Sequence, residues 1–369
     1  MPISVAFPYV APGVSANVLD ALSSAWLSPG GKYSTRFREQ IGSMYNKSNV
    51  VLTNSGTSAI EVALLSVGRV YGKASGAVLM PAYTCPDTLM AVLKAGYEPV
   101  ICDVDETRCC LTAQTLSESL SSTIVGVVPV HIYGMMVPID VYSVARKHGL
   151  FIVDDACEAF GGTVSGMSLA DLSDAVCFSF RGEKLLPIGT GGAIVTKHAG
   201  VYGVAESLVG LNSPNGAQRY WCADRCLSYE YPEVLSAIGC AQIEVFLAEI
   251  SRRLSVVELY RRQGIAIPFR AYDVPWKMPI KVRDPVLAYD FFSRAGIEIT
   301  PPFVPLHRLP GPAYLPRFHK SEVVSQRDRC LLGAEFLYEH VVALPLHSHL
   351  QDADVAQIIS TWRAFERTD

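Results

Sequence analysis

The spacing of hydrophobic and polar residues divides the chain into two parts. From about residue 49 to residue 196, short β-branched runs alternate with segments whose apolar residues recur at every third or fourth position. These are the spacings of strands and of amphipathic helices, and we expect the helices at about 58–71, 86–95 and 140–149. Regular alternation of the two predicts an α/β fold, with a mainly parallel sheet flanked by helices and ligands bound at the carboxyl ends of the strands.

Beyond residue 232 the pattern is different. Residues 232–264 have the spacing of one long helix, and later segments mix short apolar runs with helical ones. The short strands expected there are "PIKV" at 279–282, "GIEIT" at 296–300 and "VVALPL" at 341–346. We therefore predict a large domain with an N-terminal arm over residues 1–250 and a smaller α+β domain over residues 251–369.

Composition excludes several classes of protein. The 369 residues are 50% hydrophobic and 18% charged, which is typical of a globular protein, and the net charge of -4 comes without the basic cluster that nucleic-acid binding needs. The longest stretch without a formal charge, 119–139, contains Pro129, Gly134 and Pro138 and suits a strand and a turn rather than a membrane span. The chain starts without the pattern of a secretory signal. We expect a cytoplasmic protein with no nucleic-acid or membrane partner.

The ten cysteines do not form a metal-binding pattern. Only Cys222 and Cys226 approach the spacing of a ligand pair, and no second pair with suitable histidines follows. Scattered cysteines in apolar segments are typical of free thiols in a reducing compartment, so we predict no metal site.

The first candidate for chemistry is "TNSGTSA", residues 53–59, in which a strand turns through Gly56 into a helix beginning at Thr57 or Ser58. Free N–H groups and hydroxyls at the start of a helix bind phosphate well. Serine and threonine are also ordinary helix caps, so the segment alone fits either use.

The second candidate is the pair Asp154 and Asp155, which ends an apolar strand in "VDDACEAFGG". Side chains alternate along a strand, so only one of these carboxylates can face the site. That carboxylate could bind a metal, accept a proton or pair with a cationic nitrogen of a ligand, and an acidic turn can also be a simple cap.

The third candidate is Lys184, five residues beyond Ser179 and followed by the glycine turn "GTGG" at 189–192. A lysine at the end of a strand can form a Schiff base with an aldehyde, provided that burial lowers its pKa. The alternative is a surface lysine on a loop. In sequence order, a phosphate site, an acidic strand end and a lysine are the groups that pyridoxal phosphate requires for its phosphate, its pyridinium nitrogen and its aldehyde.

Several separated blocks carry a resemblance to a known family. They are "WLSPGGKYSTRFRE", "NSGTSAIEVAL", "PAYTCPDTLMAVLKAGYEPVICDVD", "VPVHIYG", "VDDACEAFGG", "CFSFRGEKLLPIGTGGAIVT", "VLSAIGCAQIE" and "VVALPLHSHL". In these blocks the sequence resembles the DegT/StrS family of pyridoxal-phosphate-dependent sugar aminotransferases, which have the aspartate-aminotransferase fold, fold type I. The resemblance implies a seven-stranded type of sheet in the large domain and a homodimer with both active sites at the interface.

The resemblance also implies roles for individual residues. Lys184 would form the Schiff base with the cofactor and move the proton during transfer, and Asp155 would pair with the pyridinium nitrogen. Asp154 then occupies the position where the family usually has Glu. The residues implied at the phosphate are Thr57, Ser58 and Ser179, beside Gly56.

Several positions depart from the family pattern. Cys85 stands where an aromatic ring usually stacks on the cofactor, and Glu158 replaces the Gln or His near the cofactor's phenolate oxygen. Ser228 replaces the Asn that reaches the neighbouring subunit's phosphate, and Glu230 and Thr190 replace an arginine and an acidic residue. For Glu158 we expect a protonated carboxyl that donates a hydrogen bond as Gln would. The alternatives are a cationic partner or a role as acid or base toward substrate.

These observations predict a pyridoxal-phosphate-dependent aminotransferase. An amino acid, L-glutamate by resemblance, would convert the cofactor to pyridoxamine phosphate, which aminates a keto group of a nucleotide-linked sugar or a sugar-like cyclitol. Two alternatives stay open: a lyase or bond-forming enzyme of secondary metabolism that uses the same cofactor, and a non-catalytic regulator that has kept the fold.

Overall fold

The structure, a computed structural model, describes residues 2–210, 225–309 and 331–368. Its centre is a seven-stranded sheet with the strand order β1-β9-β8-β5-β4-β2-β3. These strands are β1 (Asn49–Thr53), β2 (Ala77–Pro81), β3 (Glu98–Cys102), β4 (Ile124–Val127), β5 (Phe151–Asp155), β8 (Ala175–Ser179) and β9 (Gly192–Thr196). All neighbouring pairs are parallel except those of β9, which is antiparallel to both β1 and β8. The mainly parallel sheet predicted from the alternating pattern is confirmed.

The expected helices are present, with ends that differ by a few residues. The helices are α1 (Val14–Ser23), α2 (Lys32–Tyr45), α3 (Gly56–Val70), α4 (Pro86–Lys94), α5 (Ala113–Glu118), α6 (Ile139–Lys147), α7 (Leu169–Leu172), α8 (Ala199–Val209), α9 (Glu233–Arg262), α10 (Pro285–Arg294), α11 (Leu332–His340) and α12 (Asp352–Glu366). The helix expected at 58–71 begins earlier because Ser55 caps it: its side chain accepts a hydrogen bond from the backbone N–H of Ser58.

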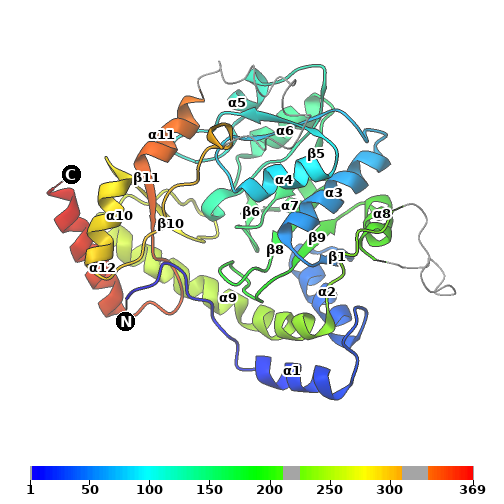
Figure 1. The fold of residues 1–369 in the computed structure, drawn as a ribbon, viewed down its shortest axis with the longest axis horizontal. Helices are drawn as coiled ribbons and strands as arrows, with labels where there is room; N and C mark the ends of the chain where they lie inside the picture. Colours follow the sequence, from blue (N-terminus) through cyan, green and yellow to red (C-terminus); the bar gives the residue numbers. More distant parts are fainter. Residues whose placement is uncertain (1, 211–224, 310–330, 369) are drawn as a thin grey trace.

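Helix α3 is the element that brings the strand ends and the helix start together. It is almost wholly buried and packs on β1, β5, β8 and β9, with α4 and α8 beside it (Figure 1). Because β5 and β8 are parallel neighbours, their carboxyl ends lie at the same edge of the sheet, where α3 begins. This arrangement places the segments around residues 56, 155 and 179 next to one another.

A second, smaller group of elements lies at the far end of the long helix α9 (Figure 1). It contains the antiparallel pair β10 (Met278–Lys281) and β11 (Val341–Leu344), with α10 and α12. The strand expected at 296–300 is reduced to two isolated bridges, Ile297 with Ile3 and Thr300 with Ala343, because its partners offer only single residues for pairing. A short hairpin of β6 (Thr163–Val164) and β7 (Met167–Ser168) completes the strands.

The buried hydrophobic residues form two clusters. One fills the space around the large sheet, and the other joins the far end of α9 to α10, α12 and β10 and includes Ile3 from the N-terminal arm. Helix α9 contributes to both, so the predicted boundary near residue 250 falls inside a continuous helix. By length and composition alone α9 could also cross a membrane, but α1 and α2 pack along it, which is typical of a core helix in a globular protein.

Candidate active site

The start of α3 lies against the end of β8. A Cβ atom added at Gly56 would be 2.8 Å from the Cβ of Ser179 and 2.9 Å from the Sγ of Cys157. Only glycine therefore lets the helix approach this closely. The contact brings the predicted phosphate residues Gly56 and Ser179 together, with Cys157 as their common neighbour.

The hydroxyls at the start of α3 have different tasks. Ser58 donates a hydrogen bond from its hydroxyl to Oδ1 of Asn54 at 2.7 Å, and its backbone N–H binds the Ser55 hydroxyl at 3.1 Å. Ser58 is therefore engaged in capping the helix. Thr57 is half-buried, and the N–H groups of Gly56 and Thr57 precede the first intrahelical bond, which Ala59 donates to Ser55.

The two carboxylates at the end of β5 point in opposite directions, as the alternation of a strand predicts. Asp155 accepts hydrogen bonds from the Thr88 hydroxyl at 2.7 Å and from the Cys157 N–H at 3.1 Å. Asp154 faces the other side and accepts from the Tyr142 hydroxyl at 3.0 Å. Asp155 is thus the carboxylate on the side of Gly56 and Ser179.

Lys184 lies in a loop that leaves β8 and returns to β9. The backbone N–H of Lys184 binds the carbonyl of Arg181 at 2.9 Å, and farther along Ile188 closes the loop on Phe180 at 2.9 Å. Gly191 ends the loop with a φ of +119°, and a Cβ there would be 2.3 Å from the ring of Tyr231. The turn therefore needs glycine and fixes how far Lys184 stands from the strand end.

The ammonium of Lys184 is nearly buried and forms an ion pair with Glu158, with 3.2 Å between Nζ and Oε1. Burial by itself lowers the pKa of Lys184, but the Glu158 carboxylate beside it has the opposite effect and, with the Cys157 and Cys85 sulfurs, leaves the pKa raised. The expectation that burial lowers this pKa is therefore wrong for the protein without cofactor. The ion pair with Glu158 therefore favours the ammonium form of Lys184.

Glu158 accepts hydrogen bonds on both oxygens. Oε1 faces Lys184, and Oε2 accepts from the backbone N–H of Tyr133 at 2.8 Å. Burial raises the pKa of the Glu158 carboxyl, although the Lys184 ammonium and the Tyr133 N–H oppose that rise. Glu158 is therefore arranged as a carboxylate with a cationic partner, which was one of the alternatives open from the sequence. It is not arranged as the expected neutral acid that donates a hydrogen bond.

Cys85 is the residue before α4 and has an extended backbone there. Burial raises the pKa of its thiol to about 11, with smaller effects from neighbours that include Glu158 and Lys184. The thiol is protonated near neutral pH and is a weak nucleophile. Cys85 is therefore within electrostatic range of Lys184 but is a packing group rather than a reactive thiolate.

Ser228 and Thr190 both lie next to the strand end that precedes α3. Thr190 donates its hydroxyl to the carbonyl of Asn54 at 3.0 Å, and the carbonyl of Tyr229 accepts from the Asn54 N–H at 2.9 Å. Ser228 itself is exposed, with a φ of +55°. Its predicted reach to a neighbouring subunit's phosphate stays a prediction.

Three residues of this site were not identified from the sequence. Thr88 and Cys157 hold the two oxygens of Asp155, and the indole ring of Trp276 lies 4.0 Å from the Lys184 nitrogen. Thr88 could have been identified from the sequence, because it lies in the first turn of a helix that follows a strand. Trp276 comes from a distant linker, and no local pattern marks it.

Comparison with known proteins identifies the family of this chain. Residues 11–363 match the DegT/DnrJ/EryC1/StrS aminotransferase family. The chain belongs to that family. Since the match spans nearly the whole chain, the protein is an aminotransferase that uses the family's cofactor, pyridoxal phosphate.

Individual relatives agree with this assignment. GDP-perosamine synthase of Caulobacter vibrioides is 28% identical, with 97% of this chain and 96% of the relative covered. The L-glutamine:2-deoxy-scyllo-inosose aminotransferase of Streptomyces fradiae is 31% identical over 53% of this chain and 47% of its own length. Among solved structures, the Helicobacter pylori aminotransferase PseC has the same fold, with a TM-score of 0.88 at 19% identity and complete coverage of both chains.

The residues of this aminotransferase fit the cofactor. The N–H groups at the start of α3 and the Ser179 hydroxyl form a neutral, donor-rich place for a phosphate. Asp155 is buried with one hydrogen-bond donor on each oxygen, which leaves each oxygen a further lone pair for a ring nitrogen. Lys184 supplies the amine. In the described parts of the chain, no group of three or more His, Cys, Asp or Glu could hold a metal ion, and Cys222 lies outside those parts.

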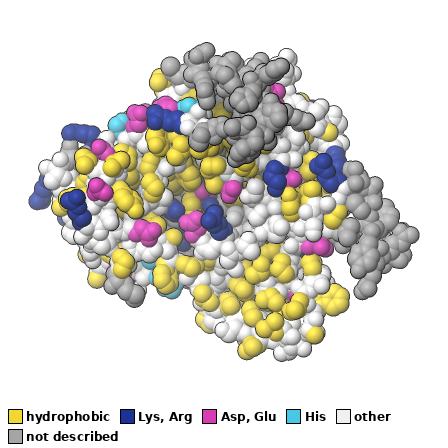
Figure 2. Space-filling view, viewed as in Figure 1, with side chains coloured by type: hydrophobic (Ala, Val, Ile, Leu, Met, Phe, Trp, Pro, Cys, Tyr) yellow, Lys and Arg dark blue, Asp and Glu magenta, His cyan; other side chains and the backbone are white. Residues whose placement is uncertain are grey.

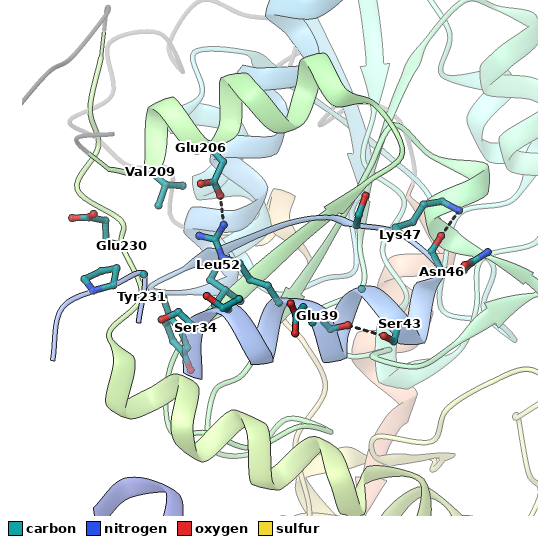
Figure 3. Close-up of a pocket in the computed structure, with 16 residues that line it drawn as sticks. Ser34, Glu39, Ser43, Asn46, Lys47, Leu52, Glu206, Val209, Glu230 and Tyr231 are labelled. Atoms are coloured by element: carbon teal, nitrogen blue, oxygen red, sulfur yellow. Dashed lines mark hydrogen bonds and ion pairs between the residues drawn. The ribbon is translucent and has the colours of Figure 1, made fainter. Parts of the chain in front are cut away.

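A large open hollow lies elsewhere, between α2 and α8 (Figure 3). Its volume is about 870 Å³, and its lining includes Glu206, labelled in Figure 3, and Arg38, which forms an ion pair with Glu206 at 2.8 Å. The lining includes Gly30 and Glu230 but none of the residues around Lys184. The residues proposed for the chemistry of this aminotransferase therefore lie outside this hollow.

Proposed function

We propose that this aminotransferase moves an amino group from an α-amino acid, L-glutamate in the first place, to a keto carbon of a nucleotide-linked sugar. The observation that carries the proposal is the meeting of Gly56, Asp155, Ser179 and Lys184 around Cys157, in a chain that belongs to an aminotransferase family. Support for the acceptor comes from the GDP-perosamine synthase likeness, which extends over both chains almost completely.

The cofactor, when bound, would supply the electron sink that makes the hydrogen on the carbon bearing the migrating nitrogen acidic. The chain's own residues do the rest. Thr57 and Ser179 hold the phosphate, and Asp155 holds a proton on the ring nitrogen. Nζ of Lys184 takes up and returns the proton at the reacting carbon, and Glu158 stabilises the charged form of that amine.

Conversion of the cofactor by the donor tests the first half of the proposal. Incubation of the purified, cofactor-loaded protein with L-glutamate is expected to yield 2-oxoglutarate and to replace the visible absorption of pyridoxal phosphate by that of pyridoxamine phosphate. A lyase that uses the same cofactor would instead release a product without accumulating the pyridoxamine form. L-glutamine is the second donor to test, because one relative is named for it.

The acceptor is tested with the pyridoxamine form. Keto sugars linked to GDP, dTDP and UDP are expected to restore the absorption of pyridoxal phosphate, with one nucleotide preferred. A keto-cyclitol is the second candidate, because the inosose aminotransferase of Streptomyces fradiae shares 31% identity with about half of this chain. Restoration by the cyclitol alone would replace the sugar-nucleotide proposal.

We also propose that the active protein is a homodimer. Hydrophobic side chains gather over α1 on the face seen in Figure 2. Leu19 and Leu22 on α1 and Trp26 and Leu27 after it are all exposed. Such a patch is typical of a protein interface. Sedimentation of the wild type is expected to give twice the mass of one chain, and Leu19→Glu with Leu22→Glu is expected to shift it toward the monomer.

A further inference from the structure

Two lysine ammonium groups share one indole ring beside the site. Nζ of Lys184 lies 4.0 Å from the centre of the Trp276 ring, and Nζ of Lys277 lies 4.3 Å from the same point. The two nitrogens are therefore no farther apart than the sum of these distances. Cations at such distances are attracted to the face of an indole ring.

The ring that carries both lysines is firmly held. The indole N–H of Trp276 donates to the Glu183 carbonyl at 2.7 Å, and its backbone N–H donates to the Tyr133 carbonyl at 3.0 Å. The Trp276 carbonyl accepts from Arg253 at 3.0 Å. Three separate segments thus fix one residue, so the position of Lys277 relative to Lys184 is set before any ligand arrives.

The linker leading to Trp276 is anchored as well. Asp273 forms a buried ion pair with Arg108 at 3.1 Å and also accepts from the backbone N–H of Met136 at 2.7 Å. Gly134, with a φ of +84°, lets Val274 approach so closely that a Cβ would lie 1.8 Å from its carbonyl oxygen. Lys277 is therefore part of the wall of the large domain's site, although it directly precedes β10.

Lys277 is a nearly buried cation with a weak partner. Its side chain is 7% exposed, and its nearest carboxylate, that of Glu183, is 3.4 Å away and 40% exposed. An ammonium has three donors, and Glu183 occupies one of them at a long distance. Burying a cation costs free energy unless acceptors are close, so, as far as the described residues show, Lys277 has both the charge and the donors left over to bind an anion.

The α-carboxylate of an amino-acid donor is an anion at a suitable distance from the donor's amine. Its α-carboxylate oxygens lie about 3 Å from the amine that it gives up, by ordinary bond lengths. A charge-assisted hydrogen bond adds about 2.8 Å. The donor's amine at the position of Lys184 and its carboxylate on Lys277 fit within the separation that the shared ring allows.

We propose that Lys277 binds the carboxylate of the amino-acid donor and thereby selects amino acids over simple amines. The inference rests on the proposed transfer from an amino acid. Lys277 does not take part in moving protons or electrons. It positions the donor so that its amine and the carbon next to it face Lys184.

The test compares donors with and without a carboxylate in Lys277→Met. The KM for L-glutamate is expected to rise about 10-fold to 100-fold, the range of a lost charge-assisted hydrogen bond, while kcat/KM for propylamine stays within about 2-fold of wild type. Lys277→Arg is expected to restore part of the glutamate affinity. Lys281→Met, at an exposed lysine at the far end of β10, is the matched control and should change neither value.

Binding of glutarate gives a readout that does not depend on turnover. Glutarate has no amine, and its dissociation constant from the cofactor-loaded protein, measured by calorimetry, is expected to rise about 10-fold in Lys277→Met and to fall in Glu183→Gln, which removes the competing carboxylate. Unchanged glutarate binding in both variants would overturn the role of Lys277. Failure of wild type to deaminate L-glutamate would instead refute the proposed function, with the glutarate result still deciding the anion site.

Discussion

The two halves of the active site differ in charge. At the start of α3 the cofactor's phosphate would meet only neutral groups: backbone N–H donors, the Ser179 hydroxyl and the hydroxyl of Thr57. Around Trp276 the chain gathers two cations and two anions, with Glu158 opposite Lys184 and Glu183 opposite Lys277. One half is neutral, whereas the other holds charges of both signs, with a close partner for Lys184 and a more distant one for Lys277.

This difference determines how each half responds to a substitution. A neutral hydroxyl removed from the phosphate end leaves no charge uncompensated, so the loss is that of one hydrogen bond. A charge removed from the Trp276 end leaves its partner buried and unpaired, which changes the pKa of the remaining group as well as the contact. The predictions below separate the two halves by the size and kind of effect.

The largest effect is expected for Lys184→Ala. A methyl group can neither attach the cofactor nor move a proton, so turnover should fall to background. The variant should also lose the yellow colour of covalently attached cofactor. Absorption spectra and steady-state assays check both results, with Lys281→Ala as the control. Near-normal turnover in Lys184→Ala would end the assignment of this lysine.

Asp155→Asn should come next, with kcat lowered about 100-fold or more. A neutral amide cannot balance a protonated ring nitrogen, and removing one preorganised charge from a buried site typically costs this much. The fold should persist, since Asn has the same shape and the Thr88 hydroxyl can turn to accept instead of donate. Assays and thermal melting measure the two effects separately.

Asp154→Asn is the matched control for that variant. Asp154 faces away from the site, where Oδ1 accepts from Tyr142 and lies 3.3 Å from Nε2 of His131. Asn keeps a carbonyl oxygen that can accept from Tyr142, and its NH2 group would replace Oδ2, which has no partner in the described part of the chain. We expect kcat within about 3-fold of wild type. A larger loss in Asp154→Asn than in Asp155→Asn would exchange the roles of the two carboxylates.

The segments that carry Gly56, Asp155, Ser179 and Lys184 were predictable from the sequence because each of them is local. The turn through Gly56, the strand ending in Asp155 and the loop from Ser179 to Lys184 each occupy a few consecutive residues. The parallel α/β pattern also predicted that ligands bind at the carboxyl ends of the strands, which is where these segments lie. The resemblance to the family implied Ser58 at the phosphate, whereas in the structure its hydroxyl donates to Asn54.

The contacts of the charged half could not be predicted, because they join segments that lie far apart in the sequence. Trp276 and Lys277 lie about ninety positions beyond Glu183 and Lys184, in a linker whose pattern predicts only the strand that follows. The partner of Glu158 depends on which way the loop of Lys184 turns. The sign of the pKa shift of Lys184 depended on that partner, so an argument from burial alone gave the wrong direction.

Glu158→Gln should change the pH dependence of cofactor attachment more than its final extent. Only the unprotonated amine of Lys184 can react with the cofactor's aldehyde. The Glu158 carboxylate raises the pKa of that amine, so its removal lowers the pKa, and the rate of attachment should rise at lower pH than in the wild type. Stopped-flow absorbance over a range of pH measures the shift. An unshifted profile with lost turnover would make Glu158 a catalytic acid or base.

The smallest effects are expected at the phosphate end, where they distinguish Thr57 from Ser58. Thr57→Val should weaken cofactor binding about 10-fold, the loss of one hydrogen bond to a charged acceptor, with little change in melting temperature. Ser58→Ala should lower the free energy of unfolding by about 1 kcal/mol, because the Ser58 hydroxyl donates to Asn54 within the helix cap. The affinity for the cofactor should change less than 3-fold. Equilibrium titration of the cofactor-free protein and thermal melting measure the two quantities. If Ser58→Ala released the cofactor and Thr57→Val did not, the Ser58 hydroxyl would have to leave Asn54 when phosphate binds, and the phosphate end would be rearranged by its ligand rather than built in advance.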